Sequence, residues 1–289
     1  MSAVAWFVLR RHPSTESSHL TSERVFLLRV ASSRFAVIVL MILAVALPVV
    51  AGALDKVVPK PPSNSVPSAI VIGFVGGFVS HKNQHHGPVI LAQQIRRAVP
   101  NGTYVQVFEN RRRKDAFDTV LRLLDGDHDG VLSSEEKGNA RIVIFGHSWG
   151  AAAAVLLARD LQRMGIPVSL TVQVDSVAKW WQNDSVIPDN VAQAVNFYQT
   201  QGIVHGRRQI VAADPAHTEI LGNYRMDYKK DPVVCPQASW WDRVFTPGHM
   251  QSECDPNLWS QIRSLVTQRL SPKTTAAAIS QSQDAQPTR

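Results

Sequence analysis

The stretch RIVIFGHSWGAAAAVLLARDL, residues 141–161, joins three different patterns in direct succession. Arg141 is followed by four bulky apolar residues, as expected for a strand that is buried on both faces. A pentapeptide bounded by two glycines, GHSWG at 146–150, comes next. Residues 151–164 then predict a helix rich in small residues. A buried strand, a tight turn and a helix in this order form one unit of an α/β fold.

The same alternation extends in both directions along the chain. Runs of apolar and β-branched residues predict further strands at 69–74, 104–108, 168–174 and 209–213. Helices are predicted at 89–98, 115–124 and 256–270. Strands that alternate with helices predict a mostly parallel sheet with helices on both faces. The length of 289 residues suits one such domain with appendages.

The N-terminal region predicts export. Residues 35–54 contain no charge and could just span a bilayer. Five arginines precede them, and Ala51-Gly52-Ala53 offers a cleavage site. Residues 1–54 are therefore expected to be either a cleaved signal peptide or an N-terminal membrane anchor. Either one makes the protein periplasmic, secreted or anchored to a membrane.

Two more segments are expected to lie outside the folded domain. Residues 55–68 are rich in proline and predict a linker, and residues 272–289 predict a disordered polar tail. The domain itself is therefore expected at residues 69–271. The net charge is +7, but no nucleic-acid motif accompanies the basic run at 111–114, which is more typical of a solvated helix start.

Ser148 is the candidate nucleophile. Gly146 and Gly150 permit a sharp turn and close packing of the helix on the strand. Ser148 then projects from the end of the strand, where the helix N-terminus would stabilise a developing oxyanion. His147 is adjacent to Ser148 and is expected to point away from it as a packing residue.

This strand, turn and helix resemble the nucleophile elbow of the α/β-hydrolase superfamily. The resemblance covers roughly residues 69–270, although only the elbow is specific. It implies an α/β-hydrolase fold and a serine esterase or lipase-like enzyme that acts on a small-molecule ester or a lipid. The chemistry implied is acyl transfer from an ester to Ser148 and then to water.

The resemblance also implies an acid and a histidine that follow Ser148 along the chain. Asp175 ends the strand predicted at 168–174, where lipase- and chlorophyllase-like members carry their acid. Asp214, after the strand predicted at 209–213, is the alternative acid. His249, in a loop before the last helix, is the implied base, with His205 and His217 as rivals.

The implied oxyanion hole combines two backbone N–H groups. One belongs to Trp149, directly after the nucleophile, and the other to the loop GFVGGF at 73–78. Val75 is the expected donor in that loop, with Phe74 next. The loop does not match the G-x-G-x-x-G fingerprint, so no organic cofactor is expected.

Residues 125–136, DGDHDGVLSSEE, match the calcium loop of an EF-hand without a gap. The template places calcium ligands at six positions: Asp125, Asp127, Asp129, Val131, Ser133 and Glu136. The alternative is an acidic surface turn that binds nothing. A structural calcium ion is expected, which would attach the preceding helix to the strand that ends at Ser148 and so fix the elbow.

Two features complete the sequence. Cys235 and Cys254 are the only cysteines, and in an oxidising compartment an even pair suggests a disulfide, although two unpaired residues are equally compatible. Thioesterases and peptidases use the same catalytic groups as esterases. A hydrolase fold without activity, serving as a calcium-binding envelope protein, is the alternative of a different class.

Overall fold

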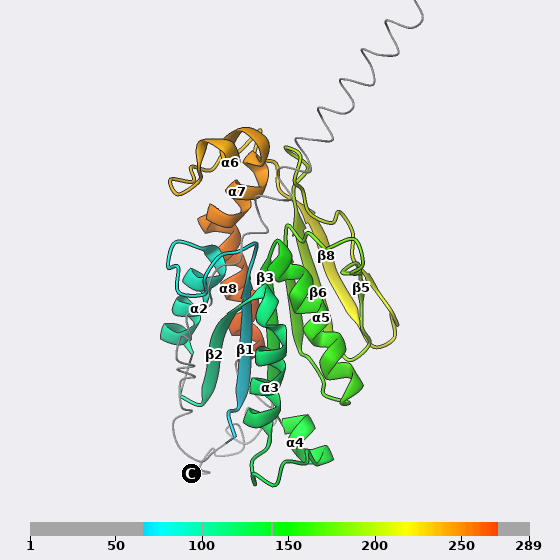
Figure 1. Ribbon diagram of the computed structural model, residues 1–289. Coiled ribbons are helices and arrows are strands. Elements are labelled where there is room, and N and C mark those ends of the chain that lie inside the picture. The colour runs from blue at the N-terminus through cyan, green and yellow to red at the C-terminus, as the bar shows by residue number, and fades with distance from the viewer. Residues whose placement is uncertain (1–65, 100, 140, 271–289) are drawn as a thin grey trace, which may run out of the picture. The chain divides into compact units, whose positions relative to one another are not determined.

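A computed structural model of the protein describes residues 66–99, 101–139 and 141–270. Its centre is a six-stranded sheet in the order β2-β1-β3-β4-β6-β8, and every neighbouring pair is parallel (Figure 1). The six strands are β1 (Ala69–Val75), β2 (Thr103–Glu109), β3 (Arg141–His147), β4 (Leu170–Val174), β6 (Gln193–Tyr198) and β8 (Glu219–Arg225). The short β5 (Val186–Ile187) and β7 (Val211–Ala212) form a separate parallel pair.

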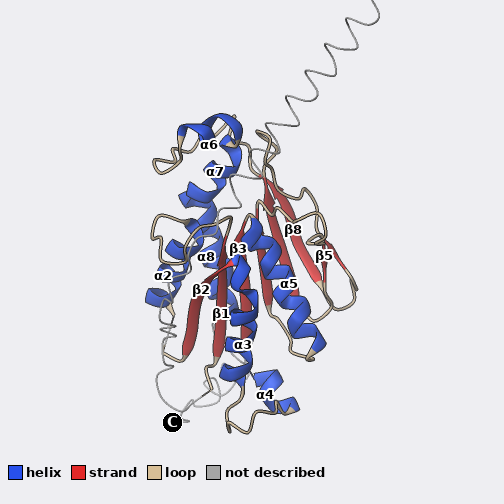
Figure 2. Cartoon of the chain, in the orientation of Figure 1, coloured by secondary structure: helices blue, strands red, loops and turns tan. Residues whose placement is uncertain are grey.

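Helices cover both faces of the sheet (Figure 2). The helices α2 (Gly87–Ala98) and α8 (Pro256–Leu270) pack on one face, and α3 (Arg113–Leu124) and α5 (Trp149–Arg163) pack on the other. The short α4 (Ser134–Asn139) lies at the edge where the strands begin. The helices α6 (Trp240–Phe245) and α7 (Pro247–Cys254) lie at the edge where the strands end.

Strand β1 shows why the sheet is buried on both faces. Its side chains alternate between two apolar layers: Ile70 and Ile72 pack toward α3 and α5, whereas Val71 and Val75 pack toward α2 and α8. Every residue of the strand is buried. Burial of one such side chain contributes about 1.5–3 kcal/mol to the free energy of unfolding. A strand with a continuous apolar run is therefore favoured where both faces of the sheet are covered.

The predicted α/β-hydrolase fold is confirmed, and one strand was assigned wrongly. The strands predicted at 69–74, 104–108, 141–145 and 168–174 correspond to β1 to β4. The strand predicted at 209–213 contains only the two residues of β7, which lie outside the main sheet. The sheet continues instead through β6 and β8. Both strands contain polar residues between short apolar stretches and lack the continuous apolar run of β1.

The predicted signal peptide or anchor at 1–54 and the predicted tail at 272–289 lie outside the described residues, as does the linker up to residue 65. Among the residues that the structure describes, no helix is long and apolar enough to cross a membrane.

Candidate active site

Ser148 occupies a sharp turn between β3 and α5. Its backbone has φ 57° and ψ −127°, a conformation that residues other than glycine rarely adopt. Gly146 and Gly150 make the turn possible, because a Cβ on Gly146 would overlap the backbone of Gly150. The turn is fixed by hydrogen bonds: the Ser148 N–H donates to the Val174 carbonyl oxygen at 2.9 Å.

Three side chains form a hydrogen-bonded chain at this turn. His249 Nε2 lies 2.9 Å from Ser148 Oγ, and His249 Nδ1 lies 2.6 Å from Asp175 Oδ2. Ser148 and His249 are almost fully buried, and Asp175 is completely buried. This geometry suits a base that takes the serine proton and a carboxylate that orients the base.

The carboxylate of Asp175 is held from several directions. Its Oδ2 also accepts from the side-chain amide of Gln199 at 2.6 Å, and its Oδ1 accepts from the backbone N–H of Gly206 at 2.6 Å. Burial by itself raises the pKa of Asp175. The hydrogen bond and charge of His249, together with the bond from Gln199, more than offset burial, and the pKa is lowered. The acid is therefore kept ionised.

The three side chains meet because they come from the same edge of the sheet. Ser148 follows β3 and Asp175 follows β4, and parallel neighbours end at the same edge. His249 was expected in a loop, which is wrong: it lies in the first turn of α7. Pro247 begins this helix, and proline is well suited to a first helical position. The eight-residue helix shows almost no apolar periodicity, so the sequence pattern gave no sign of it.

The alternative acid and the rival histidines lie elsewhere. Asp214 accepts from His217 Nδ1 at 2.7 Å, in a turn just before β8 begins. Strands begin at the edge opposite Ser148, so Asp214 as triad acid is wrong. His217 is in that same turn, and His205 is exposed and makes no side-chain bond to Ser148.

The loop after β1 lies against the nucleophile. The residue in contact is Gly76, because a Cβ there would lie only 2.7 Å from Ser148 Cβ. Val75, the expected oxyanion donor, is the last residue of β1, one position earlier. The side-chain amide of Asn110 donates to the carbonyl oxygens of Val75 and Gly77, at 3.3 and 2.5 Å, and so fixes the loop. The paired glycines were the sequence signal that could have identified Gly76.

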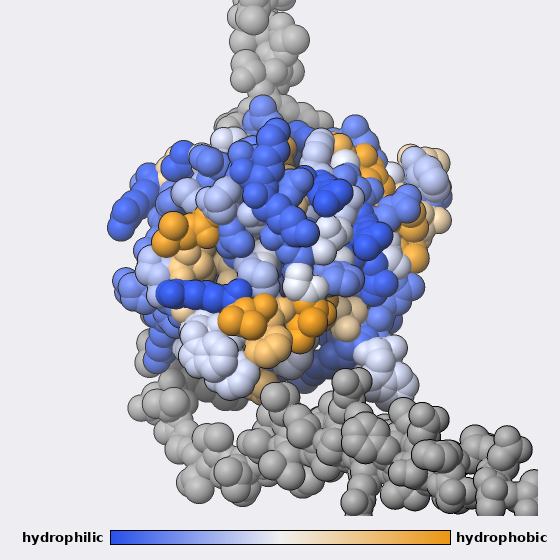
Figure 3. Space-filling view, turned by 90° about the horizontal axis from the view of Figure 1, so that it is seen from above, coloured by the Kyte–Doolittle hydropathy of each residue, from blue (hydrophilic) through white to orange (hydrophobic). Residues whose placement is uncertain are grey.

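Aromatic side chains lie next to the nucleophile turn. Phe78 packs edge-on against Trp149, with ring centroids 5.6 Å apart. Lys179 Nζ lies 5.5 Å from the ring centroid of Trp149 and 5.6 Å from that of Trp181. Figure 3 looks onto the molecule from above and shows apolar residues interrupted by polar ones. Aromatic surface and a cation thus lie next to the residue that follows Ser148.

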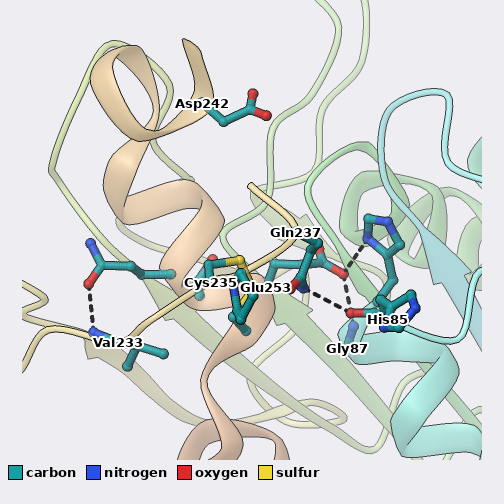
Figure 4. Close-up of a disulfide and its surroundings, with 12 residues drawn as sticks. His85, Gly87, Val233, Cys235, Gln237, Asp242 and Glu253 are labelled. Atoms are coloured by element: carbon teal, nitrogen blue, oxygen red, sulfur yellow. Dashed lines mark hydrogen bonds and ion pairs between the residues drawn. A yellow bond between two sulfur atoms is a disulfide. The ribbon is translucent and has the colours of Figure 1, made fainter. Parts of the chain in front are cut away.

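A disulfide attaches the preceding loop to α7. Cys235 and Cys254 are bonded to each other, and Gln237 donates from its side chain to the His85 carbonyl oxygen at 3.0 Å (Figure 4). The Val233 N–H also donates to the side chain of Gln251 in α7, at 2.7 Å. The helix that carries His249 is therefore fixed from outside as well as from the core.

The acidic loop at 125–136 brings together part of the predicted ligand set. Carboxylate oxygens of Asp125, Asp127 and Glu136 lie within 4.8 Å of one another. Asp125 Oδ1 is buried and has no hydrogen-bond partner among the described residues. Asp129 is not part of this cluster, and its Oδ1 accepts a hydrogen bond from the Val131 N–H at 2.7 Å.

The two remaining predicted ligands, Val131 and Ser133, are not carboxylates. Val131 is exposed, and Ser133 donates its hydroxyl to Glu136 at 2.9 Å. Oxygen atoms from carboxylates are the ligands that calcium prefers, and the unpartnered oxygen of Asp125 could accept a cation. The donor set therefore fits a calcium ion. The loop lies before β3, at the opposite end of that strand from Ser148.

Comparisons with known proteins agree with this architecture. The model of the class 3 lipase family matches residues 114–205, a segment that includes the elbow and Asp175 and ends before His249. No curated protein matches the chain. The sheet, the elbow and this match define the class: the chain has the α/β-hydrolase fold. Within that fold, residues 114–205 are similar to class 3 lipases.

Several solved structures are similar in fold. The RedJ thioesterase from the prodiginine biosynthetic pathway of Streptomyces coelicolor is 10% identical, with a TM-score of 0.38, over 77% of this chain and 96% of that chain. A thermostable esterase from Pseudomonas putida is 10% identical, with a TM-score of 0.39, over 74% and 78%. A cutinase-like protein from Cryptococcus sp. is 9% identical, with a TM-score of 0.36, over 71% and 98%.

Proposed function

We propose that the protein is a serine hydrolase that cleaves carboxylic esters. The observation that carries the proposal is the buried chain of hydrogen bonds from Ser148 Oγ through His249 to Asp175. The class 3 lipase match over the elbow supports the same chemistry. A small-molecule ester is the substrate class that suits a lipase- and esterase-like hydrolase.

In the acylation step, His249 Nε2 accepts the proton of Ser148 as Oγ attacks the ester carbonyl carbon. The carbonyl electrons move to oxygen, and backbone N–H groups at Trp149 and in the loop at Gly76 hold that oxyanion. When the tetrahedral intermediate collapses, the alcohol leaves with the proton from His249. Asp175 stabilises the imidazolium while it exists.

In the deacylation step, His249 takes a proton from water, and the resulting hydroxide attacks the acyl-enzyme. Collapse returns the proton to Ser148 Oγ and releases the carboxylic acid. No organic cofactor enters either step.

Hydrolysis of chromogenic esters of graded acyl length tests this proposal. Ser148→Ala should lower kcat by about 10⁴-fold or more, because no other described residue of the site can replace the nucleophile. The matched control is Ser264→Ala, which changes a serine of α8 that lies outside the site. Asp175→Asn should lower kcat strongly and Asp214→Asn should not. Equal rates for Ser148→Ala and wild type would exclude the proposal.

The same panel separates the other functions that this geometry allows. A thioester or an amide replaces the oxygen ester, and the substrate with the highest kcat/KM defines the class. If the protein turns over none of the three, the alternative is a calcium-binding envelope protein with a hydrolase fold and no activity.

We also propose that the loop at 125–136 binds a structural calcium ion. The three clustered carboxylates and the unpartnered Asp125 oxygen support it. β3 has seven residues, about 23 Å, between this loop and Ser148, so the ion would stabilise the fold and not the elbow itself. EDTA should lower Tm while kcat measured well below Tm is retained. Glu136→Gln should abolish the calcium response, and its neighbour Glu135→Gln should keep it.

We further propose that the protein acts outside the cytoplasm. The uncharged stretch at 35–54 with arginines in front, and the disulfide between Cys235 and Cys254, support export. Cell fractionation, with N-terminal sequencing of the mature chain, tests this and separates a cleaved signal from an anchor. Recovery of uncleaved protein from the cytoplasm would contradict it.

A further inference from the structure

A second buried group of polar side chains lies directly behind the proposed catalytic base. Glu253 is on α7, four residues after His249, so both side chains project from neighbouring turns of one helix. The carboxylate of Glu253 is almost completely buried. It pairs with His147 Nδ1 through Oε2, and through Oε1 it accepts from the Gly87 N–H at 2.9 Å and from His86 Nδ1 at 3.0 Å.

These contacts join three elements at one carboxylate. His147 is the last residue of β3 and precedes the nucleophile, Gly87 begins α2, and Glu253 belongs to the helix of His249. Figure 4 shows Glu253 between the disulfide and Gly87. The helix that carries His249 is thus connected to the strand that leads into Ser148, although the two residues are far apart in the sequence.

The ring of His147 also supports the ring of His249. The two ring centroids are 4.7 Å apart and the planes are inclined by 33°. His147 was expected to be only a packing residue that points away from Ser148. It does pack, but against the imidazole on which the proposed chemistry depends.

The hydrogen-bond partners of His147 define its protonation. Nδ1 faces the carboxylate of Glu253, which only accepts, so Nδ1 carries a proton. Nε2 lies 3.1 Å from Ser252 Oγ, and that hydroxyl donates its single proton to the His249 carbonyl oxygen at 2.8 Å. Ser252 Oγ therefore accepts from Nε2. With a proton on both nitrogens, His147 is an imidazolium.

The ionisation of the two groups agrees with this pairing. Burial favours the neutral forms of both, but the charge and hydrogen bond of each partner outweigh it. The pKa of His147 is raised and that of Glu253 is strongly lowered. The charge of Asp175, which lies on the other side of the ring of His249, also raises the pKa of His147. His86 contacts Glu253 and is therefore linked to His147 through that carboxylate.

We propose that His147 and Glu253 form a buried ion pair that positions His249 and places a positive charge beneath its ring. The proposal rests on the proposed function, because it assigns a role toward that base. Both are positioning residues: neither touches Ser148 Oγ or the ester. The pair thus places its positive charge next to the imidazole that accepts the serine proton in the proposed mechanism.

Glu253→Gln tests the role of the pair, because glutamine keeps the shape and removes the charge. We expect kcat to fall about tenfold to hundredfold, since a misplaced base loses rate steeply, while KM changes by about twofold or less. The acid limb of the kcat/KM profile should move to higher pH. His86→Gln, the matched control, removes one bond to the same carboxylate and leaves the pair with His147, so the profile should stay in place.

A loss of stability alone would lower Tm in both variants without moving the profile. If the acid limb of Glu253→Gln coincides with that of wild type, the positioning role is overturned. A ¹⁵N–¹H spectrum of the imidazole nitrogens of the full-length wild type shows whether the ion pair exists. This measurement does not require Glu253→Gln to fold. The signal that is lost in His147→Gln should show both nitrogens protonated at about pH 7. A neutral pattern would overturn the proposal.

This spectrum needs no substrate. If Ser148-dependent hydrolysis is absent and His147 is an imidazolium, the proposed function fails while the ion pair stands. If hydrolysis depends on Ser148 and His147 is neutral, only the ion pair fails.

Discussion

At the scale of single residues, the site depends on close backbone contacts as much as on the three reactive side chains. Ser148 has a positive φ, and a non-glycine residue keeps such a conformation only where its surroundings compensate the strain. Here the compensation comes from glycines that allow neighbouring backbones to approach the turn. The nucleophile is therefore sensitive to a single added methyl group.

Gly76→Ala should lower kcat by about a hundredfold, because its Cβ would collide with Ser148 Cβ and with the His147 carbonyl oxygen, displacing the nucleophile by a fraction of an ångström or more. The matched control is Gly138→Ala in α4, where a Cβ meets nothing within 4 Å. Steady-state kinetics on one chromogenic ester compare the two variants. A Gly76→Ala enzyme with the kcat of wild type would show that the loop does not press on Ser148.

Residues were predictable from the sequence where local order alone defines them. Ser148 follows a strand with a continuous apolar run, and Asp175 follows a strand in which apolar and polar residues alternate, so the places of both could be predicted from the pattern. The role of Glu253 could not be read, because its partner Gly87 is 166 residues away and His147 is recognisable only as part of the turn. A buried carboxylate on a short helix looks like any surface glutamate in the sequence.

At the scale of elements, α7 combines most of the features that no pattern predicted. Its eight residues include His249, Ser252, Glu253 and Cys254. Tertiary contacts of these side chains stabilise the helix, which has no regular apolar face. The sequence pattern did not predict β6 for a related reason, because a polar residue is buried within it. Asn196 donates to the side chain of Asn223 in β8 at 3.1 Å. Polar residues that are satisfied across strands interrupt the apolar run that marks β1 and β3.

Removal of the disulfide should loosen this helix. Cys235→Ser/Cys254→Ser should lower the free energy of unfolding by about 2–4 kcal/mol, mainly because the unfolded chain is less constrained. Since Cys254 is adjacent to Glu253, kcat should fall as well. Urea titration and ester hydrolysis measure the two effects. A double variant with the free energy of unfolding and the kcat of wild type would mean that the core contacts of α7 are enough to position the helix without the disulfide.

At the scale of the whole molecule, buried ionised groups make the stability depend on pH. The folded-state pKa values of Asp175 and Glu253 are lowered, so their contribution is present above about pH 4 and is lost as the pH falls. The pKa of His147 is raised, so its contribution is present below about pH 6.5 and is lost as the pH rises through the raised value.

The free energy of unfolding should therefore be greatest between about pH 4 and pH 6.5 and should fall on both sides. Urea titrations across this range measure it. In Glu253→Gln the fall on the alkaline side should be reduced, because His147 no longer gains a proton on folding. A wild-type protein whose stability keeps rising above about pH 8 would contradict the ion pair.

The central claim is that Ser148 is the nucleophile of a hydrolase, and its reaction with a fluorophosphonate probe tests this most directly. Mass spectrometry of the full-length protein locates the adduct. The structure predicts a single adduct on the peptide that contains Ser148, present in wild type and in Ser264→Ala and absent from Ser148→Ala. No adduct on wild type, or an adduct that persists in Ser148→Ala, would contradict the claim.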